Sequence, residues 1–453
     1  MLPYIYFYRE HGSKVEDKIK LQMKLRQSIL DITALLIVAA ASLSIVYVKG
    51  IGVVDFGDGQ DYLRSAASIF SEQGYLREGL TWPFFRPPGY PFAIACIWKV
   101  LGVESIIALK FFNILLHLLS TFIIAKILRH HYDQKTSIVG MLLFGLNPFV
   151  LLPLADIQTE PLILFLFLVF SYFLVKQSTY LNLALTALLA LSITAVRPEY
   201  LFAILIICPI LLFSKLRSQK TVIKSLCILF ILTFSLSWWG IQNKKATGSF
   251  IVLTNATDYL LWNGSTEQIY KNYNLSLRYN PHFDTEQYIA IQNEIQRNVD
   301  KWGSSYSNAT VGRRSSFWRS AYFENVKASP LRYFGKTLEK MTIFWRPFLN
   351  PNSHGIKTSA LSMLILLPIT IGTALRLFNL RRKVLKDILV LSYLSGLGVL
   401  TVVHMFQMPD QRYKFPLLIP LSSIILAPFI WQILSSMPSK LGFLTTGKIK
   451  KEN

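Results

Sequence analysis

Long apolar runs alternate with short polar segments along most of the chain, and this pattern predicts helices that cross a membrane. Each run is about the length that a helix needs to span a hydrocarbon layer of about 30 Å, and several contain no ionisable residue. The predicted fold class is therefore an all-α polytopic membrane protein with a bundle of about ten transmembrane helices. The ten predicted spans are residues 30–48, 105–127, 136–153, 160–176, 180–196, 199–214, 222–240, 358–379, 387–405 and 415–434.

The positions of lysine and arginine predict which way the bundle faces. Basic residues collect beside alternate ends of the spans, at Arg9 to Arg26, Lys126 and Arg129, Lys215 to Lys224, Arg381 to Lys386, and Lys440 to Lys451. The positive-inside rule puts these segments in the cytoplasm, so both termini are expected there. The organisation is then a tail at 1–29, a membrane module at 30–434 and a second tail at 435–453. Two long loops, about 49–104 and 241–357, face the periplasm or exterior.

Both long external loops contain stretches typical of helices that lie at a membrane surface. Residues 61–70 are amphipathic, and residues 92–101 are apolar but too short to cross. Residues 330–345 have apolar side chains at helical spacing with basic side chains between them. Such patterns favour interfacial helices rather than further spans.

Composition and charge exclude two other classes of protein. The chain is 52% hydrophobic and 16% charged, whereas about a quarter of the residues of a soluble domain are charged. A net charge of +22 is compatible with nucleic-acid binding, but no basic stripe interleaved with aromatic residues marks a binding module. Membrane topology accounts for the charge, so the expected partners include membrane lipids and no nucleic acid. The absence of a Walker loop argues against an ATP-driven pump.

Acidic residues cluster at the predicted external mouths of the spans. Asp58 and Asp61 follow the first span and are three residues apart, so a helix would place both on one face. Asp156 and Glu160 lie in the short turn before the fourth span. If the two turns meet, one carboxylate can take a proton from an acceptor hydroxyl while another orients sugar hydroxyls or binds a divalent cation. The alternative is that the aspartates cap an interfacial helix.

A second cluster is cationic and consists of Arg86, Arg197, Arg412 and Lys414. Arginine binds phosphate through two parallel hydrogen bonds, and a cation stabilises the charge on a departing phosphate. The alternative is that these long side chains reach toward lipid headgroups. The turn that holds Arg197 is so short that its guanidinium is expected near membrane depth, where an unpaired charge is costly.

Several motifs together resemble a known superfamily. The run Asp58-Gly-Gln-Asp-Tyr62, with Ala66 after it and Arg86-Pro-Pro-Gly-Tyr-Pro91 further on, resembles the first external loop of GT-C membrane glycosyltransferases. It is most similar to the bacterial branch related to protein O-mannosyltransferases and to the aminoarabinose transferase of lipid A. The resemblance continues through Asn147-Pro148, Thr159-Glu160-Pro161, Arg197-Pro198, Trp238 to Asn243, and Arg412-Tyr-Lys-Phe-Pro416.

The resemblance implies roles for particular residues. Asp58 would be the catalytic acid residue that acts on the acceptor, and either Glu160 or Asp156 would be the second acid. Arg86 would bind the donor phosphate, joined by the other three cations. Asp61 and Tyr62 would contact substrate or support the site. In the relatives an acidic neighbour often follows the catalytic aspartate, whereas Gly59 follows here.

The resemblance also implies an activity. Superfamily members take a sugar from a polyprenyl- or dolichyl-phosphate carrier outside the cytoplasm and generally invert the anomeric centre. The predicted function is transfer of a monosaccharide from a polyprenyl-phosphate-linked donor to an envelope lipid, glycan or protein acceptor, at the bacterial inner membrane. No cofactor is assigned, and a divalent cation is left open. Two alternatives are a lipid-linked glycan transporter or flippase and a non-catalytic envelope assembly subunit. Charges gathered at one face, rather than near the midplane, favour the enzyme.

Overall fold

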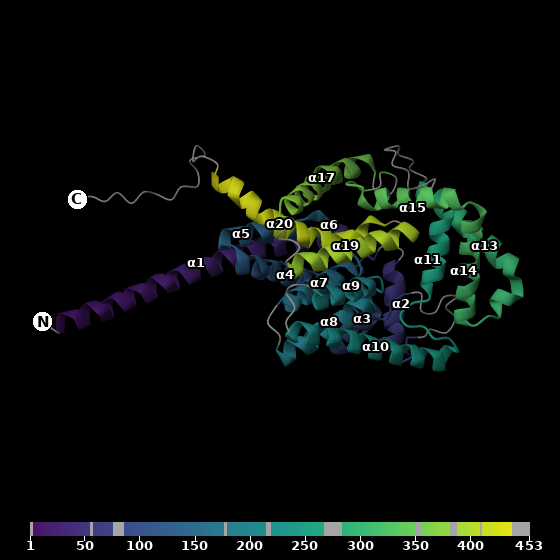
Figure 1. The fold of residues 1–453 in the computed structure, drawn as a ribbon, viewed down its shortest axis with the longest axis horizontal. Helices are drawn as coiled ribbons and strands as arrows, with labels where there is room; N and C mark the ends of the chain where they lie inside the picture. The colour runs from purple at the N-terminus through teal and green to yellow at the C-terminus, as the bar shows by residue number, and fades with distance from the viewer. Residues whose placement is uncertain are drawn as a thin grey trace.

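The protein is helical throughout the part of the chain that the structure describes (Figure 1). The structure is a computed structural model, and it describes residues 3–54, 58–75, 86–175, 179–213, 219–266, 283–349, 351, 355–380, 387–407 and 410–436. The α-helices are α1 (Pro3–Lys49), α2 (Asp58–Phe70), α3 (Gly89–Leu101), α4 (Ile106–His131), α5 (Gln134–Gly145), α6 (Pro148–Leu151), α7 (Glu160–Val175), α8 (Tyr180–Val196), α9 (Tyr200–Phe213), α10 (Gln219–Thr247), α11 (Ala256–Ser265), α13 (Phe283–Ser307), α14 (Val311–Ala328), α15 (Pro330–Trp345), α17 (Ile356–Asn379), α19 (Ile388–Phe406) and α20 (Phe415–Ser436). Two short 3₁₀ turns are η1 (Leu152–Ala155) and η2 (Gln411–Lys414).

All ten predicted spans coincide with apolar helices, which confirms the predicted fold class. Among the residues that the structure describes, six helical segments are long and apolar enough to cross a membrane: Gln27–Lys49, Ile106–His130, Val222–Thr247, Ile356–Asn379, Ile388–Phe406 and Gln411–Ser436. A seventh span is formed if the pair Gln134–Gly145 and Pro148–Ala155, bent by 59°, is counted as one. The other three predicted spans, α7, α8 and α9, are apolar helices shorter than a full crossing.

The short helices are the part of the bundle that positions the site. A helix rises 1.5 Å per residue, so the 16 residues of α7 and the 17 of α8 extend less than about 30 Å. α7 begins at Glu160 and α8 ends before Arg197. Polar turns therefore lie where a longer helix would continue to the membrane surface.

The bend between α5 and α6 has a local cause in the Asn147-Pro148 pair. The Asn147 side chain accepts a hydrogen bond from the Phe149 backbone amide at 3.0 Å, and Pro148 occupies the first turn of the new helix. An asparagine cap followed by proline favours a helix start. The chain thereby turns before η1 and delivers Asp156 to the end of the bundle.

Helix α2 packs on α3, and α3 packs on α8. The rings of Tyr62 and Tyr90 meet edge to face with centroids 5.0 Å apart. Gly89 lies so close to the end of α8 that an added Cβ would come within 2.5 Å of the Ala195 carbonyl carbon. A side chain cannot fit there, so Gly89 allows the Arg86 loop to lie beside the turn that holds Arg197.

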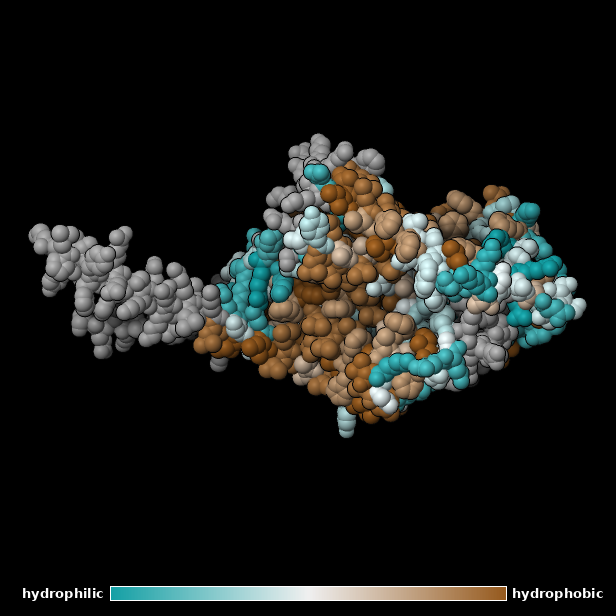
Figure 2. Space-filling view, turned by 90° about the horizontal axis from the view of Figure 1, so that it is seen from below, coloured by the Kyte–Doolittle hydropathy of each residue, from teal (hydrophilic) through white to brown (hydrophobic). Residues whose placement is uncertain are grey.

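Helices α11, α13 and α14 gather at one end of the molecule, opposite the end from which α1 projects (Figure 1). They come from the predicted loop 241–357 and have a small aromatic core of their own, centred on Trp262 and Trp318 with ring centroids 4.4 Å apart. Figure 2 shows a broad hydrophobic surface over the middle of the molecule between hydrophilic surfaces toward both ends. This belt is the surface expected of an integral membrane protein.

Candidate active site

Asp58 lies at the centre of a charged cluster built from three distant parts of the chain. Its Oδ1 accepts a hydrogen bond from Arg86 Nη2 at 2.6 Å, and its Oδ2 accepts one from Arg412 Nη2 at 3.2 Å. Arg86 also donates to Asp61 Oδ2 from Nε at 3.2 Å and from Nη2 at 3.0 Å. Both aspartates lie in the first turn of α2 and on one face of it, as their spacing predicted, and that face meets Arg86. About a third of the Asp58 side chain is exposed, so a substrate can reach it.

The arginines keep Asp58 ionised. Burial by itself would raise the pKa of the Asp58 carboxyl, but Arg86, Arg412 and Arg197 outweigh burial and hold that pKa below its usual range. Burial would lower the pKa of Arg86, yet the nearby Asp58 raises it above the ordinary value. At neutral pH the cluster therefore contains a carboxylate facing guanidinium cations.

The start of α2, which carries Asp58, lies against the turn that carries Asp156. This contact was the condition on which the sequence analysis expected a shared site. Gly59 packs against the segment before α7, where a Cβ would lie 3.2 Å from the Ile157 carbonyl oxygen and 3.0 Å from a Val54 methyl carbon. Such contacts are tighter than most side chains allow. The glycine that departs from the superfamily pattern thus fits the close approach of α2 to the turn that carries Asp156.

Arg197 and Glu160 form a buried ion pair. Arg197 Nη2 donates to Glu160 Oε1 at 2.9 Å, Nε donates to the Thr159 hydroxyl at 2.6 Å, and Nη1 lies 3.5 Å from Glu199 Oε1. The guanidinium also lies over the Tyr413 ring, 4.2 Å from its centroid. All three of its nitrogens lie against groups of the protein, and the residue is buried, whereas the side chains of Arg86 and Arg412 are partly exposed. These contacts favour a positioning role for Arg197 over the predicted phosphate contact.

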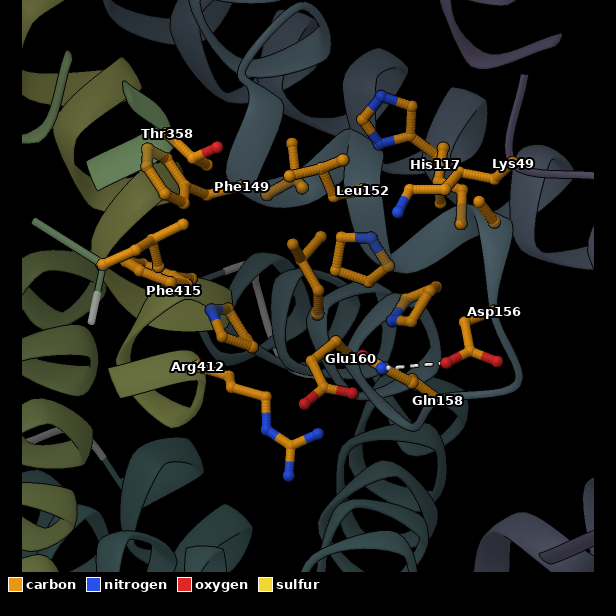
Figure 3. A pocket seen from close by; sticks show the side chains of 18 of the residues that line it. Lys49, His117, Phe149, Leu152, Asp156, Gln158, Glu160, Thr358, Arg412 and Phe415 are labelled. Carbon is orange, nitrogen blue, oxygen red and sulfur yellow. Dashed lines mark hydrogen bonds between the residues drawn. The ribbon is translucent and has the colours of Figure 1, made fainter. Parts of the chain in front are cut away.

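A cavity of about 510 Å³ lies beside this cluster (Figure 3). Its walls are mostly apolar and include Phe149, Leu152 and Phe415, while Glu160 and Arg412 lie together on one side. Arg412 thus contacts Asp58 and also lines the cavity. The arrangement suits an anionic group that carries an apolar tail.

Both candidates for the second acid line the same cavity. Asp156 Oδ1 accepts from the Ile157 amide at 2.8 Å, and Oδ2 accepts from Gln158 Nε2 at 3.2 Å. Glu160 is bound to Arg197 and lies nearer to Arg412 (Figure 3). The choice between Asp156 and Glu160 stays open.

Two further predicted residues support Arg86 and Arg412 rather than pointing into the cavity. The Tyr62 ring lies 5.4 Å from the Arg86 guanidinium carbon, a cation–π contact. Lys414 is buried, and its ammonium donates to the carbonyl oxygens of Phe344 at 2.6 Å and Arg346 at 3.0 Å. The sequence analysis missed Asp410, whose carboxylate accepts from Arg412 Nε at 2.6 Å. Its position two residues before Arg412 was the signal that could have found it.

The described residues do not form a protein-only site for a divalent cation. No group of three or more histidine, cysteine, aspartate or glutamate side chains gathers within the described ranges. Both oxygens of Asp58 face arginines, and those of Asp156 accept hydrogen bonds from Ile157 and Gln158. The divalent cation stays a prediction, which sugar transfer in the presence of EDTA tests.

Part of the chain matches a known protein family. Residues 85–239 match the family model of dolichyl-phosphate-mannose-protein mannosyltransferase. That segment includes Arg86, Asp156, Glu160 and Arg197. The search of curated proteins found no match.

Two solved structures are similar to this chain at low sequence identity, and the first of them shares its fold. The archaeal oligosaccharyltransferase AglB from Archaeoglobus fulgidus, in complex with an inhibitory peptide and a dolichol-phosphate, is 11% identical with a TM-score of 0.51. The match covers 93% of this chain but 52% of that one, so this chain spans about half the length of AglB. ArnT from Cupriavidus metallidurans bound to undecaprenyl phosphate is 12% identical, with 89% and 81% of the two chains covered and a TM-score of 0.38.

The fold is that of a polytopic membrane protein and is shared with AglB, while the family match covers residues 85–239, about a third of the chain. The predicted resemblance to GT-C membrane glycosyltransferases is thereby confirmed, and the matched segment includes the Arg86 motif but begins after Asp58.

Proposed function

We propose that the protein transfers a monosaccharide from a polyprenyl-phosphate carrier to an envelope acceptor, with inversion at the anomeric carbon. The acceptor is a lipid, a glycan or a protein. The observation that carries the proposal is the Asp58 carboxylate held between Arg86 and Arg412, beside a cavity with apolar walls. A base for a hydroxyl, cations for a phosphate and an apolar surface for a lipid are the three elements that this reaction needs.

The chemistry assigned to each residue follows from its charge. Asp58 takes the proton of the acceptor hydroxyl as the oxygen attacks the anomeric carbon. The bond from that carbon to the phosphate oxygen breaks, and the polyprenyl phosphate leaves with the bonding electron pair. Arg86 and Arg412 stabilise the charge on the departing phosphate. The transition state has the oxocarbenium character known from glycoside hydrolysis.

The remaining assignments are part of the same proposal. Arg197 holds Glu160 beside the cavity, where Glu160 or Asp156 orients hydroxyls of the sugar or acceptor. The termini lie in the cytoplasm of a bacterium, the active site faces the periplasm or exterior, and the segment 241–357 recognises the acceptor. The distribution of basic residues supports this orientation.

Transfer by the purified protein in lipid tests the proposal. Radiolabelled polyprenyl-phosphate sugars serve as donors, an extract of the cell's own envelope serves as acceptor, and parallel reactions contain EDTA. Label that appears in an envelope product establishes the enzyme and identifies the donor and acceptor. Failure of every donor would overturn the proposal in favour of a transporter or an assembly subunit.

Replacing Arg86 with methionine is expected to raise the donor KM by roughly 10- to 100-fold. A hydrogen bond to a charged group contributes about 1.5–3 kcal/mol, and methionine keeps most of the apolar stem while removing the charge. Initial rates at varied donor concentration measure the effect. Arg64→Met is the control, because Arg64 also belongs to this part of the chain but its side chain is exposed. An unchanged KM in Arg86→Met would remove Arg86 from the donor site.

The same Arg86→Met variant is expected to lose activity at a higher pH than the wild type on acidification. Asp58 must be ionised to take a proton, so the rate falls as the pH drops through its pKa. Because Arg86 helps to hold that pKa low against the effect of burial, its removal raises the pKa and moves the acid limb upward. The pH profile of kcat/KM measures this shift. An acid limb that stays in place would contradict the assignment of Asp58 as the base.

A further inference from the structure

The turn that carries Arg412 is bound on several sides, and each contact comes from a different residue of the turn. The Asp410 carboxylate accepts from the Arg412 amide at 2.9 Å, capping the turn. The ring of Tyr413 lies between the Arg197 guanidinium and the ring of His404, with centroid distances of 4.2 Å and 4.6 Å. Only Arg412, among the four residues of η2, directs its charge to Asp58.

The other two residues of η2 bind the C-terminal end of α15. Gln411 Nε2 donates to the carbonyl oxygens of Ile343 at 3.0 Å and Arg346 at 3.1 Å. Lys414 Nζ donates to those of Phe344 at 2.6 Å and Arg346 at 3.0 Å. The last carbonyl groups of a helix have no partner within the helix, and a cation there is also favoured by the helix dipole. Two side chains of one turn thus bind the end of another helix 65 or more residues away.

These contacts are buried, which makes the attachment rigid. Lys414 is 1% exposed and Gln411 is 7% exposed. If η2 moved relative to α15, the buried Lys414 ammonium and the carbonyl oxygens of Phe344 and Arg346 would lose these hydrogen bonds, and each such loss would destabilise the protein. The position of Arg412 is therefore tied to the position of α15.

We propose that Gln411 and Lys414 are positioning residues that hold Arg412 against Asp58 by anchoring η2 to the end of α15. This inference rests on the proposed function, because Arg412 is taken to bind the donor phosphate. Lys414 then acts through Arg412 and does not itself bind the donor phosphate. α15, a helix of the external segment, contributes to the donor site by fixing the position of η2.

A matched pair of buried lysines tests the inference. Lys224 is also buried, at 2% exposed, and its ammonium donates to the carbonyl oxygens of Phe173 at 2.9 Å and Leu174 at 3.2 Å. Lys224→Met and Lys414→Met both remove a buried ammonium from backbone carbonyl groups, but Lys224 lies on α10 and binds the end of α7 opposite Glu160, whereas Lys414 belongs to the Arg412 turn. We expect Lys414→Met to raise the donor KM at least about tenfold, because even a small displacement of a binding group weakens binding strongly. Lys224→Met is expected to stay within about twofold of the wild-type KM.

A double-mutant cycle separates positioning from general damage. If Lys414 acts through Arg412, then Lys414→Met adds nothing further to the donor KM of Arg412→Met. Lys414→Arg, which keeps the donors, is expected to restore much of the affinity. Thermal unfolding midpoints in detergent show whether the two lysine variants are equally stable, and Gln411→Leu replaces Lys414→Met if that variant does not fold.

The outcomes distinguish failure of the inference from failure of the proposed function. A wild type that transfers sugar, with equal KM values for Lys414→Met and Lys224→Met or with additive effects in the cycle, overturns the inference alone. A wild type that transfers nothing overturns the proposed function. In that case binding of undecaprenyl phosphate to the protein in nanodiscs is measured with the same variants. The same pattern of affinities would support the anchor, and equal affinities would overturn it.

Discussion

Replacing Asp58 with asparagine is expected to lower kcat by at least about 10²- to 10⁴-fold, the usual contribution of a general base. Asparagine has nearly the same shape but carries no charge, so it cannot take the proton of an acceptor hydroxyl. The fold should persist, because Arg86 keeps Asp61 and Arg412 keeps Asp410 as partners. Initial rates at saturating donor measure the loss.

Asp61→Asn is the matched control for this variant. Asp61 also binds Arg86 and lies in the same helical turn, but of the two aspartates it is Asp58 that binds Arg412. We expect Asp61→Asn to raise the donor KM modestly while kcat stays within about tenfold of the wild type, since it changes the surroundings of Arg86 and not the base. Normal turnover in Asp58→Asn would rule out the mechanism. An equal loss of kcat in both variants would show that catalysis depends on the total negative charge of the cluster rather than on Asp58 as the base.

Replacing Arg197 with methionine is expected to destabilise the protein by about 3–5 kcal/mol, the usual effect of breaking a buried ion pair. Glu160 is 6% exposed and would lose its cation, and Thr159 would lose a hydrogen-bond donor. The loss of stability should appear as a lower thermal unfolding midpoint in detergent. Activity should fall as well, because the turn before α7 and the ring of Tyr413 both depend on Arg197.

The double variant Arg197→Met with Glu160→Gln tests the cause. Neutralising Glu160 removes the uncompensated buried charge, so much of the stability should return although the ion pair is absent. The recovery should be incomplete, since Glu199 also lies beside Arg197. A double variant no more stable than Arg197→Met would show that packing of the arginine, rather than its charge, is what matters.

The most accurate predictions were those that depend only on the residues of a single segment. The ranges of the ten apolar runs and of the stretch 330–345 agree closely with helices of the structure. Asp58 and Asp61 share a face because a helix repeats every 3.6 residues, and Arg86 binds both. The predicted ranges of α7, α8 and α9 also agree with the helices, which have 16, 17 and 14 residues. Their hydrophobicity alone did not show that they are shorter than a full crossing with polar turns at their ends.

The sequence did not predict which charged side chains from distant segments bind each other. Arg86, Arg197, Arg412 and Lys414 had the same description as cations near the external mouth, and one phosphate-binding role was assigned to all. In the structure Arg86 and Arg412 face Asp58, Arg197 is bound to Glu160, and Lys414 binds the end of α15. Charge and spacing cannot tell a cation directed at a cavity from one bound to a backbone carbonyl.

The sequence by itself determined that the chain is a helical membrane protein with acids and arginines at the ends of its helices. It did so because lipid solvation acts on each segment through local hydrophobicity and helical period. Only the tertiary structure decided which of those charges meet. Asp58 and Arg412 are 354 residues apart, Gly59 lets the start of α2 pack against Ile157, and Lys414 ties the Arg412 turn to the end of α15. A charge near membrane depth acquires its role from the partner that the packing of distant helices brings to it.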